Sequence, residues 1–181
     1  LCDRVEKRFA RAHGAFRGQR FAVLGMGKLG SREMSATSDL DLMLVYEPED
    51  ETGGNLATRF VQRLIAALSA PTEEGTLYEV DMQLRPSGRA GPVAVKLSSF
   101  QRYYREDAWT WEFMALTRIR PVAGDPSLCR RIVEVSRDAL RAKAADPNIT
   151  ADVADMRRRM ARERPARSRW DVKLAPGGLV D

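Results

Sequence analysis

The segment SDLDL, residues 38–42, places two aspartates one residue apart inside an otherwise aliphatic run. Successive side chains of a β-strand point to opposite faces, so Asp39 and Asp41 share one face and lie about 7 Å apart along the strand. Two unpaired carboxylates at the end of a buried strand would be costly. We therefore expect a positively charged group between them.

A glycine-rich segment, GMGKLG at residues 25–30, precedes these aspartates and matches the dinucleotide-binding pattern G-x-G-x-x-G. A Rossmann unit needs a helix of a dozen or so residues before its next parallel strand. Only eight residues separate Gly30 from Asp39, so we reject the Rossmann interpretation. The sequence also has no G-x-x-x-x-G-K-[ST], which excludes a P-loop.

A different arrangement accounts for both segments. Backbone N–H groups at Gly30 and Ser31, with the Ser31 hydroxyl, would face a triphosphate, and Asp39 and Asp41 would hold Mg²⁺ bridging those phosphates. Asp81, central in YEVDMQL, is the natural third carboxylate. Two Mg²⁺ ions held by these acids would stabilise the attacking and leaving oxygens. The alternative is that the aspartates only mark the start of a strand.

Periodicity predicts an α+β sheet region followed by helices. Helices are expected where apolar residues recur at helical spacing, at residues 3–13 and from Leu56 to Leu68 with Arg59 and Arg63 outside. Short apolar or alternating runs predict strands at residues 20–25, 39–46, 76–86 and 91–97.

From Ser98 onward the pattern predicts only helices. Ser98 and Gln101 form an expected capping box, Asp125 and Pro126 are expected to start a further helix, and Thr150 to cap another. We predict a first domain at 1–120 that contains the sheet and the N-terminal helix, and at 121–181 an all-helical extension that begins a truncated helical domain.

Composition limits the class of protein. The chain has 181 residues, is 44% hydrophobic, and contains no 18-residue apolar run, so no membrane span is expected. Two distant cysteines and one histidine build neither a usual zinc site nor a disulfide framework, which favours a cytoplasmic location. The absence of an initiator Met and the ending GGLVD suggest a fragment of a longer protein.

The net charge of +5 is unevenly distributed. Residues 152–170 contain seven arginines. Such a run forms either a solvated helix face or a surface for phosphate or an acidic protein.

The glycine turn, D-x-D strand and third acid resemble the DNA polymerase β-like nucleotidyltransferases. More specifically, four motifs resemble the adenylyltransferase domains of bacterial glutamine synthetase adenylyltransferase: GMGKLGSREMSATSDLDLMLVY, YEVDMQLRPSGRAGPV, AWTWEFMALTRIRPVAGD and WDVKLAPGGLVD. Ser31 departs from the Gly-Gly common in that family, and Met34 replaces a usual Leu, which conserves volume.

The resemblance implies Mg²⁺-dependent transfer of AMP from ATP to a tyrosine of glutamine synthetase. It carries over Asp39, Asp41 and Asp81 as catalytic metal ligands. The nucleotide-binding set that it implies is Gly30, Ser31, Ser38, Lys28 and Arg85. It also implies PII signal-transduction proteins as partners and glutamine as an effector.

RPSGRAG followed by AWTWE is similar to the C-terminal, adenylylating half of that family. The alternatives are phosphorolytic deadenylylation by the N-terminal half and a silent regulatory module that binds PII proteins. Nucleotide addition to RNA or to a small molecule would suit the basic stretch, but the motifs argue against it, so nucleic acid is not an expected partner.

Several residues have a structural interpretation beside the functional one. Lys28 either contacts phosphate or lies in solvent, and Glu79 either orients Asp81 or is a charge at the sheet edge. Trp109 and Trp111 are expected to pack in the core or between helices rather than against adenine. Lys173 and Gly177–Gly178 fall in a motif of the resembling family, and we assign them no role.

Overall fold

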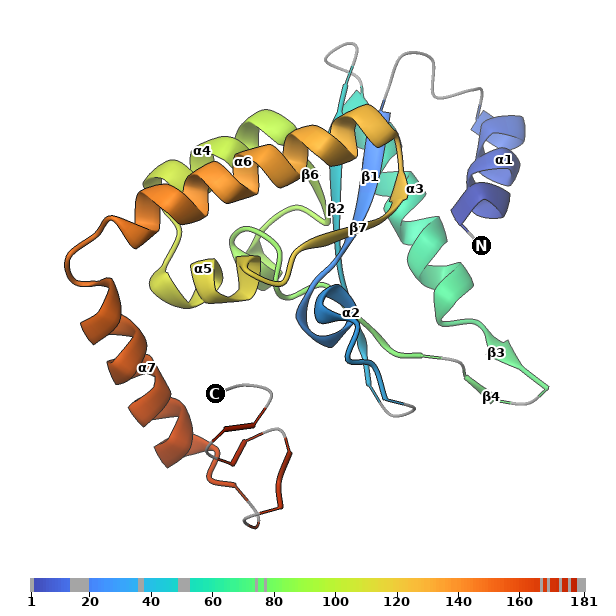
Figure 1. Ribbon diagram of the computed structural model, residues 1–181. Helices are drawn as coiled ribbons and strands as arrows, with labels where there is room; N and C mark the ends of the chain where they lie inside the picture. The colour runs from blue at the N-terminus through green and yellow to red at the C-terminus, as the bar shows by residue number, and fades with distance from the viewer. Residues whose placement is uncertain are drawn as a thin grey trace.

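The centre of the molecule is a mixed sheet, shown by the computed structural model in Figure 1. The structure describes residues 2–13, 20–35, 38–48, 53–73, 75–76, 78–166, 168, 170–172, 174–175 and 177–178. Its strands are β1 (Arg20–Gly25), β2 (Leu40–Glu47), β3 (Pro71–Thr72), β4 (Gly75–Thr76), β5 (Val80–Asp81), β6 (Ala94–Lys96) and β7 (Arg120–Gly124). Its helices are α1 (Cys2–His13), α2 (Gly27–Ser31), α3 (Gly53–Leu68), α4 (Leu97–Glu106), α5 (Thr110–Leu116), α6 (Pro126–Ala144) and α7 (Ile149–Glu163).

Five of the strands form the main sheet, in the order β5-β2-β1-β7, with β6 also paired to β2. β1 lies antiparallel between β2 and β7. The aspartate-bearing strand β2 is parallel to β5 at its start and to β6 farther along. The antiparallel β1–β2 pair, joined through the short helix α2, is incompatible with a Rossmann unit, which supports the rejection made from the sequence.

The sheet is buried on both faces. The side chains of Leu42 and Leu44 pack with α1 and α3, whereas those of Met43 and Val45 pack with α4 and α6. Figure 1 shows α3 on one side of the strands and α4 with α6 on the other. This alternation buries the strand that follows the aspartates on both sides, in agreement with the expectation of a buried strand.

Several predicted elements are confirmed. α1, β1, β2 and α3 lie where the periodicity placed them, and Arg59 and Arg63 are exposed. α6 begins as expected, since the Asp125 carboxylate accepts a hydrogen bond from the Leu128 N–H at 2.8 Å and Pro126 occupies the first turn. The α+β class is therefore confirmed.

Other predictions are wrong. The strand expected over 76–86 is reduced to β4 and β5, because residues 83–90 turn into a loop with a 3₁₀ segment (Gly88–Ala90). The segment after Ser98 is not all helical, because β7 pairs with β1. The domain division at 120 and 121 stays a prediction.

Two predicted helix caps are also wrong. α4 begins at Leu97 after Lys96, so Ser98 lies inside the helix. α7 begins at Ile149 after Asn148, so Thr150 lies inside it too. Across the described residues, no helix combines the length and apolar character that a membrane crossing requires.

Candidate active site

The backbone brings the three predicted acids to one region of the sheet. Asp41 and Asp81 are direct neighbours in the parallel β2–β5 pair, where adjacent strands lie about 4.8 Å apart. Asp39 precedes β2 by one residue and is two residues from Asp41, so both occupy the same face if the extended backbone continues. The Leu40 N–H donates to the Glu79 carbonyl at 2.8 Å, which fixes this register.

Asp41 lies directly against the start of α2. Gly27 has a φ of +47°, and a Cβ added there would overlap with the Asp41 carboxylate. The Met26 N–H also donates to the Asp41 backbone carbonyl at 2.9 Å. A glycine is therefore required at position 27 for both its conformation and its closeness to the acid, which explains one glycine of GMGKLG without a dinucleotide.

The side chains of the acids do not converge as the backbone does. Asp81 accepts hydrogen bonds from the Gln83 N–H at 2.7 Å and from Gln83 Nε2 at 3.2 Å, and Asp39 is exposed. Among the residues that the structure describes, no three His, Cys, Asp or Glu side chains lie close enough to hold a metal ion. Carboxylate oxygens are nevertheless the donors that Mg²⁺ prefers. The donor chemistry and the backbone positions of the three acids therefore fit Mg²⁺.

Ser38 is buried immediately before Asp39. Its hydroxyl oxygen accepts from the Ser35 N–H at 3.0 Å and lies 2.8 Å from the Ser35 hydroxyl. The Lys28 ammonium, on α2, donates to the same oxygen at 3.5 Å. Lys28 is thus directed toward the segment that enters the D-x-D motif. A role for either residue in nucleotide binding stays a prediction.

Gly30 and Ser31 end the short helix α2. The Gly30 N–H donates to the Met26 carbonyl at 2.8 Å, and a Cβ at Gly30 would overlap with the Arg118 carbonyl. The Ser31 hydroxyl donates to Glu33 Oε2 at 2.6 Å. In these contacts Gly30 is required for close packing, and a phosphate-binding role for the turn stays a prediction.

Arg85 is buried and holds its own loop together. Its guanidinium donates to the Met82 carbonyl at 2.6 Å, the Gly91 carbonyl at 3.1 Å and the Pro92 carbonyl at 3.1 Å. Burial lowers the pKa of Arg85, and the nearby Asp81 charge partly offsets this. These contacts assign Arg85 a structural role and give no support to the predicted phosphate contact.

Two polar groups that make several hydrogen bonds, Arg120 and Glu112, were not predicted from the sequence. Arg120, in β7, donates to the Leu29 carbonyl at 2.6 Å and the Gly30 carbonyl at 2.9 Å. Glu112, buried at the start of α5, accepts from the Tyr103 hydroxyl at 2.7 Å and the Trp109 N–H at 2.9 Å. Burial, followed by this bond to Glu112, raises the pKa of Tyr103. No local pattern reveals Arg120, whereas Glu112 three residues after Trp109 is a helix-start signal.

The remaining predicted positions have mixed outcomes. Trp109 is 71% exposed, so the expectation that it packs inside is wrong, and Trp111 is partly exposed at 37%. Glu79 is exposed at the sheet edge. Gly177 has a positive φ of +79° and Gly178 donates to the Ala175 carbonyl, whereas Lys173 lies outside the described residues.

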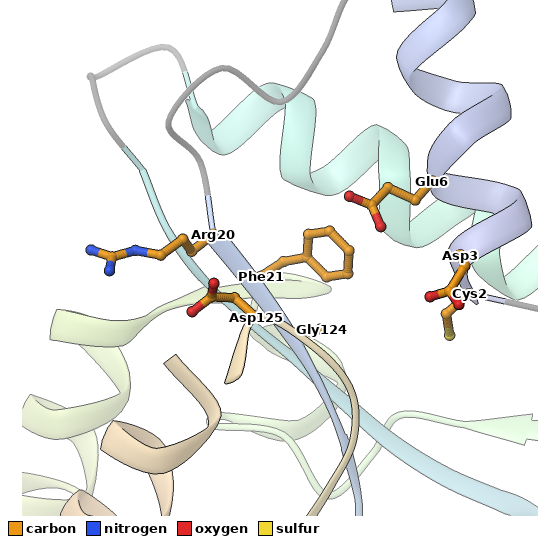
Figure 2. A pocket seen from close by; sticks show the side chains of 7 residues that line it. All are labelled: Cys2, Asp3, Glu6, Arg20, Phe21, Gly124 and Asp125. Carbon is orange, nitrogen blue, oxygen red and sulfur yellow. The ribbon is translucent and has the colours of Figure 1, made fainter. Parts of the chain in front are cut away.

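A separate pocket of about 240 Å³ lies at the opposite end of β1 from Gly25 (Figure 2). It is lined by Cys2, Asp3, Glu6, Arg20, Phe21, Gly124 and Asp125. Figure 2 shows the Phe21 ring directed toward α1, with Arg20 and Asp125 together on the other side. Because Arg20 pairs with Glu47 at the far end of β2, this pocket is distant from the aspartates.

Comparison with known sequences identifies the family. The family model of glutamate-ammonia ligase adenylyltransferase matches residues 1–134. The chain belongs to this family. It is 50% identical to the bifunctional glutamine synthetase adenylyltransferase/adenylyl-removing enzyme of Brucella suis biovar 1 (strain 1330), over 99% of the chain and 19% of that protein. It is 51% identical to the enzyme of the same description from Agrobacterium fabrum (strain C58), over 94% of the chain and 18% of that protein.

These values confirm the resemblance drawn from the sequence motifs. The chain spans about a fifth of the length of these relatives of the glutamate-ammonia ligase adenylyltransferase family. The relatives' description covers two activities, adenylyl transfer and adenylyl removal.

Proposed function

We propose that this chain is a nucleotidyltransferase domain that transfers AMP from ATP to a tyrosine of glutamine synthetase. The observation that carries the proposal is the parallel alignment of Asp41 with Asp81, with Asp39 two residues before Asp41. Family membership supports adenylyl transfer and glutamine synthetase as the substrate protein, because the name of the relatives includes both.

Asp39, Asp41 and Asp81 are the proposed ligands of two Mg²⁺ ions. Mg²⁺ bound there would stabilise charge on the phosphate oxygens and lower the pKa of the attacking hydroxyl. Asp81 positions the acceptor tyrosine and accepts its proton. The tyrosine oxygen bonds to the α-phosphorus of ATP as the bond from that phosphorus to the bridging oxygen breaks, and pyrophosphate leaves. The turn at Gly30 and Ser31, with Lys28 and Ser38 beside it, binds the leaving phosphates.

The second candidate is the reverse process, since the relatives' description also includes adenylyl removal. Inorganic phosphate would then bond to the phosphorus of AMP-tyrosine as the bond from that phosphorus to the tyrosine oxygen breaks, which releases ADP and restores the tyrosine hydroxyl. We favour the forward direction because RPSGRAG and AWTWE resemble the adenylylating half of the family. Regulation by PII proteins and glutamine, and a cytoplasmic location, remain proposals from the same resemblance.

Two assays on one preparation test the proposal. The chain is mixed with unmodified glutamine synthetase, ATP and Mg²⁺, and mass spectrometry detects added AMP. In parallel, adenylylated glutamine synthetase is mixed with phosphate and Mg²⁺, and ADP is measured, with Asp41→Asn as the inactive control for both. We expect forward labelling with little ADP release. ADP release alone would assign the chain to the removing activity. The absence of both AMP labelling and ADP release would contradict the proposal.

A further inference from the structure

Arg120, on a strand far away in sequence, donates hydrogen bonds to backbone carbonyls at the end of α2. The last carbonyls of a helix have no partner within it, and a guanidinium can bind two such oxygens with its planar fork. Arg120 Nη2 donates to Leu29 and Nε to Gly30, across a separation of 90 residues for the Gly30 contact. The side chain thereby fixes the helix end that carries Ser31.

Arg118 holds the same turn in two further ways. Its carbonyl packs against Gly30 so closely that any Cβ would overlap with it. Its guanidinium lies 3.7 Å from the Glu33 carboxylate, which in turn accepts the Ser31 hydroxyl at 2.6 Å. Arg118 therefore contacts Gly30 through its backbone, and it lies close to Ser31 through its ion pair with Glu33.

An irregularity in β7 sets the direction of Arg120. In the β1–β7 pair, Val23 is opposite Ala123 but Leu24 is opposite Pro121, so Val122 is an extra residue. A bulge of this kind redirects the side chains beyond it. After the bulge, Arg120 is the partner of Gly25, the residue from which the chain passes through Met26 into α2.

We propose that Arg118 and Arg120, here named the β7 clamp, are positioning residues that hold the Gly30–Ser31 turn in the shape that binds a nucleotide triphosphate. The inference rests on the proposed function, because it takes the turn as the phosphate site. The clamp acts through the turn and does not itself contact the nucleotide. Its loss should weaken ATP binding more than it slows the transfer step.

The test compares Arg120→Ala and Arg120→Lys with the wild-type chain of 181 residues. The matched control is Arg141→Ala, which removes an exposed arginine paired with Asp138 on α6. Titration with trinitrophenyl-ATP and Mg²⁺ gives Kd by fluorescence, transfer assays give KM and kcat, and circular dichroism checks folding. We expect Kd and KM for ATP to rise about tenfold in Arg120→Ala with a smaller change in kcat. Arg120→Lys should fall between, and the control should match wild type.

The outcomes separate the clamp from the proposed function. If folded Arg120→Ala binds the nucleotide with wild-type Kd while the wild type transfers AMP, the clamp is overturned and the function stands. If the wild type binds the nucleotide but transfers nothing, the function fails, and a weaker Kd in Arg120→Ala still supports the clamp. A wild type that binds no nucleotide overturns both. Should Arg120→Ala not fold, a folded Arg120→Lys with wild-type Kd overturns the clamp.

Discussion

Two loops flank the proposed site, and each is held by an arginine that binds backbone carbonyls. The loop of residues 82–92 follows Asp81 and is held by Arg85, which lies within it and is buried. The short helix α2 (residues 27–31), which ends in the Gly30–Ser31 turn, lies against Asp41 and is held by Arg120, from a distant strand. The loop of residues 82–92 is therefore stabilised by a residue of its own, whereas residues 27–31 are stabilised only once β7 has joined the sheet.

The same contrast appears in their glycines. A Cβ at Gly91 would overlap with the Pro86 carbonyl, which belongs to the same loop. A Cβ at Gly30 would overlap with the Arg118 carbonyl, which belongs to the approach to β7. In both loops the close backbone packing leaves no room for a side chain at the glycine. The packing partner of Gly91 is local in sequence, whereas that of Gly30 is not. The two loops should therefore respond differently to substitution.

Asp81→Asn should give the largest effect, because it removes the proposed proton acceptor beside the self-supported loop. We expect AMP transfer to fall about 10³-fold, equivalent to about 4 kcal/mol, with Kd for ATP and thermal stability nearly unchanged. Steady-state kinetics and nucleotide titration measure the two quantities. If Asp81→Asn lost transfer rate and ATP affinity equally, both loops would bind nucleotide. The difference proposed between the two loops would then be wrong.

Arg85→Ala should lower stability by about 3 kcal/mol, because it leaves the buried Met82 carbonyl and the partly buried Gly91 and Pro92 carbonyls without their donor. Urea denaturation measures the loss, and the folded molecules should bind ATP with wild-type Kd, unlike Arg120→Ala. Arg89→Ala is the matched control, since Arg89 is an exposed arginine of the same loop. A stable Arg85→Ala with weakened ATP binding would restore the phosphate contact predicted from the sequence.

Asp125→Ala should have the smallest effect, about 1 kcal/mol, through loss of the cap of α6. Hydrogen bonds from the Ser127 hydroxyl and then the Leu128 N–H lower the pKa of Asp125. Its stabilising contribution is therefore present above the unfolded-state pKa of about 3.9 and is lost as pH falls through the lower folded-state pKa.

Thermal melts of wild type and Asp125→Ala should thus differ at pH 7 and converge in strong acid. Because Asp125 follows the far end of β7 from Arg120, ATP affinity should stay at the wild-type value. Asp138→Ala, a change at an exposed ion pair on the same helix, serves as the control. A drop in ATP affinity for Asp125→Ala would show that any loosening of β7 disturbs the turn.

The parts of the fold that the sequence predicted are those with local causes. The four-residue spacing from Leu56 to Leu68 specified α3, and Asp125 followed by Pro126 specified the start of α6. β7 was missed because Pro121 and Gly124 break any alternation, and its partner β1 lies far away in sequence. Residues 83–90 alternate like a strand in part, yet Arg85 holds them in turns.

In the candidate site, too, the features with local causes were predicted from the sequence. Strand alternation placed Asp39 and Asp41 on one face, and the structure set Asp81 beside Asp41 as a partner in the parallel pair. The directions of their side chains depend on contacts such as Asp81 with Gln83, which no spacing specifies. The sequence predicted Arg85 as a phosphate ligand because Arg85 follows an acid-bearing strand. Its burial depends on the fold of the whole loop, which the spacing of residues does not specify.

The distance in sequence between Arg120 and the turn also bears on biosynthesis. A chain made on the ribosome exposes residues 27–31 before the strand that holds them, and at about 5–20 residues per second the 90 residues to Arg120 take on the order of ten seconds. Contacts of such long range form late in folding, after local helices and neighbouring strands. On the proposal above, a nascent chain that ends before β7 lacks the clamp and binds ATP more weakly than a chain translated through β7. The longer chain would then compete better for cellular nucleotide.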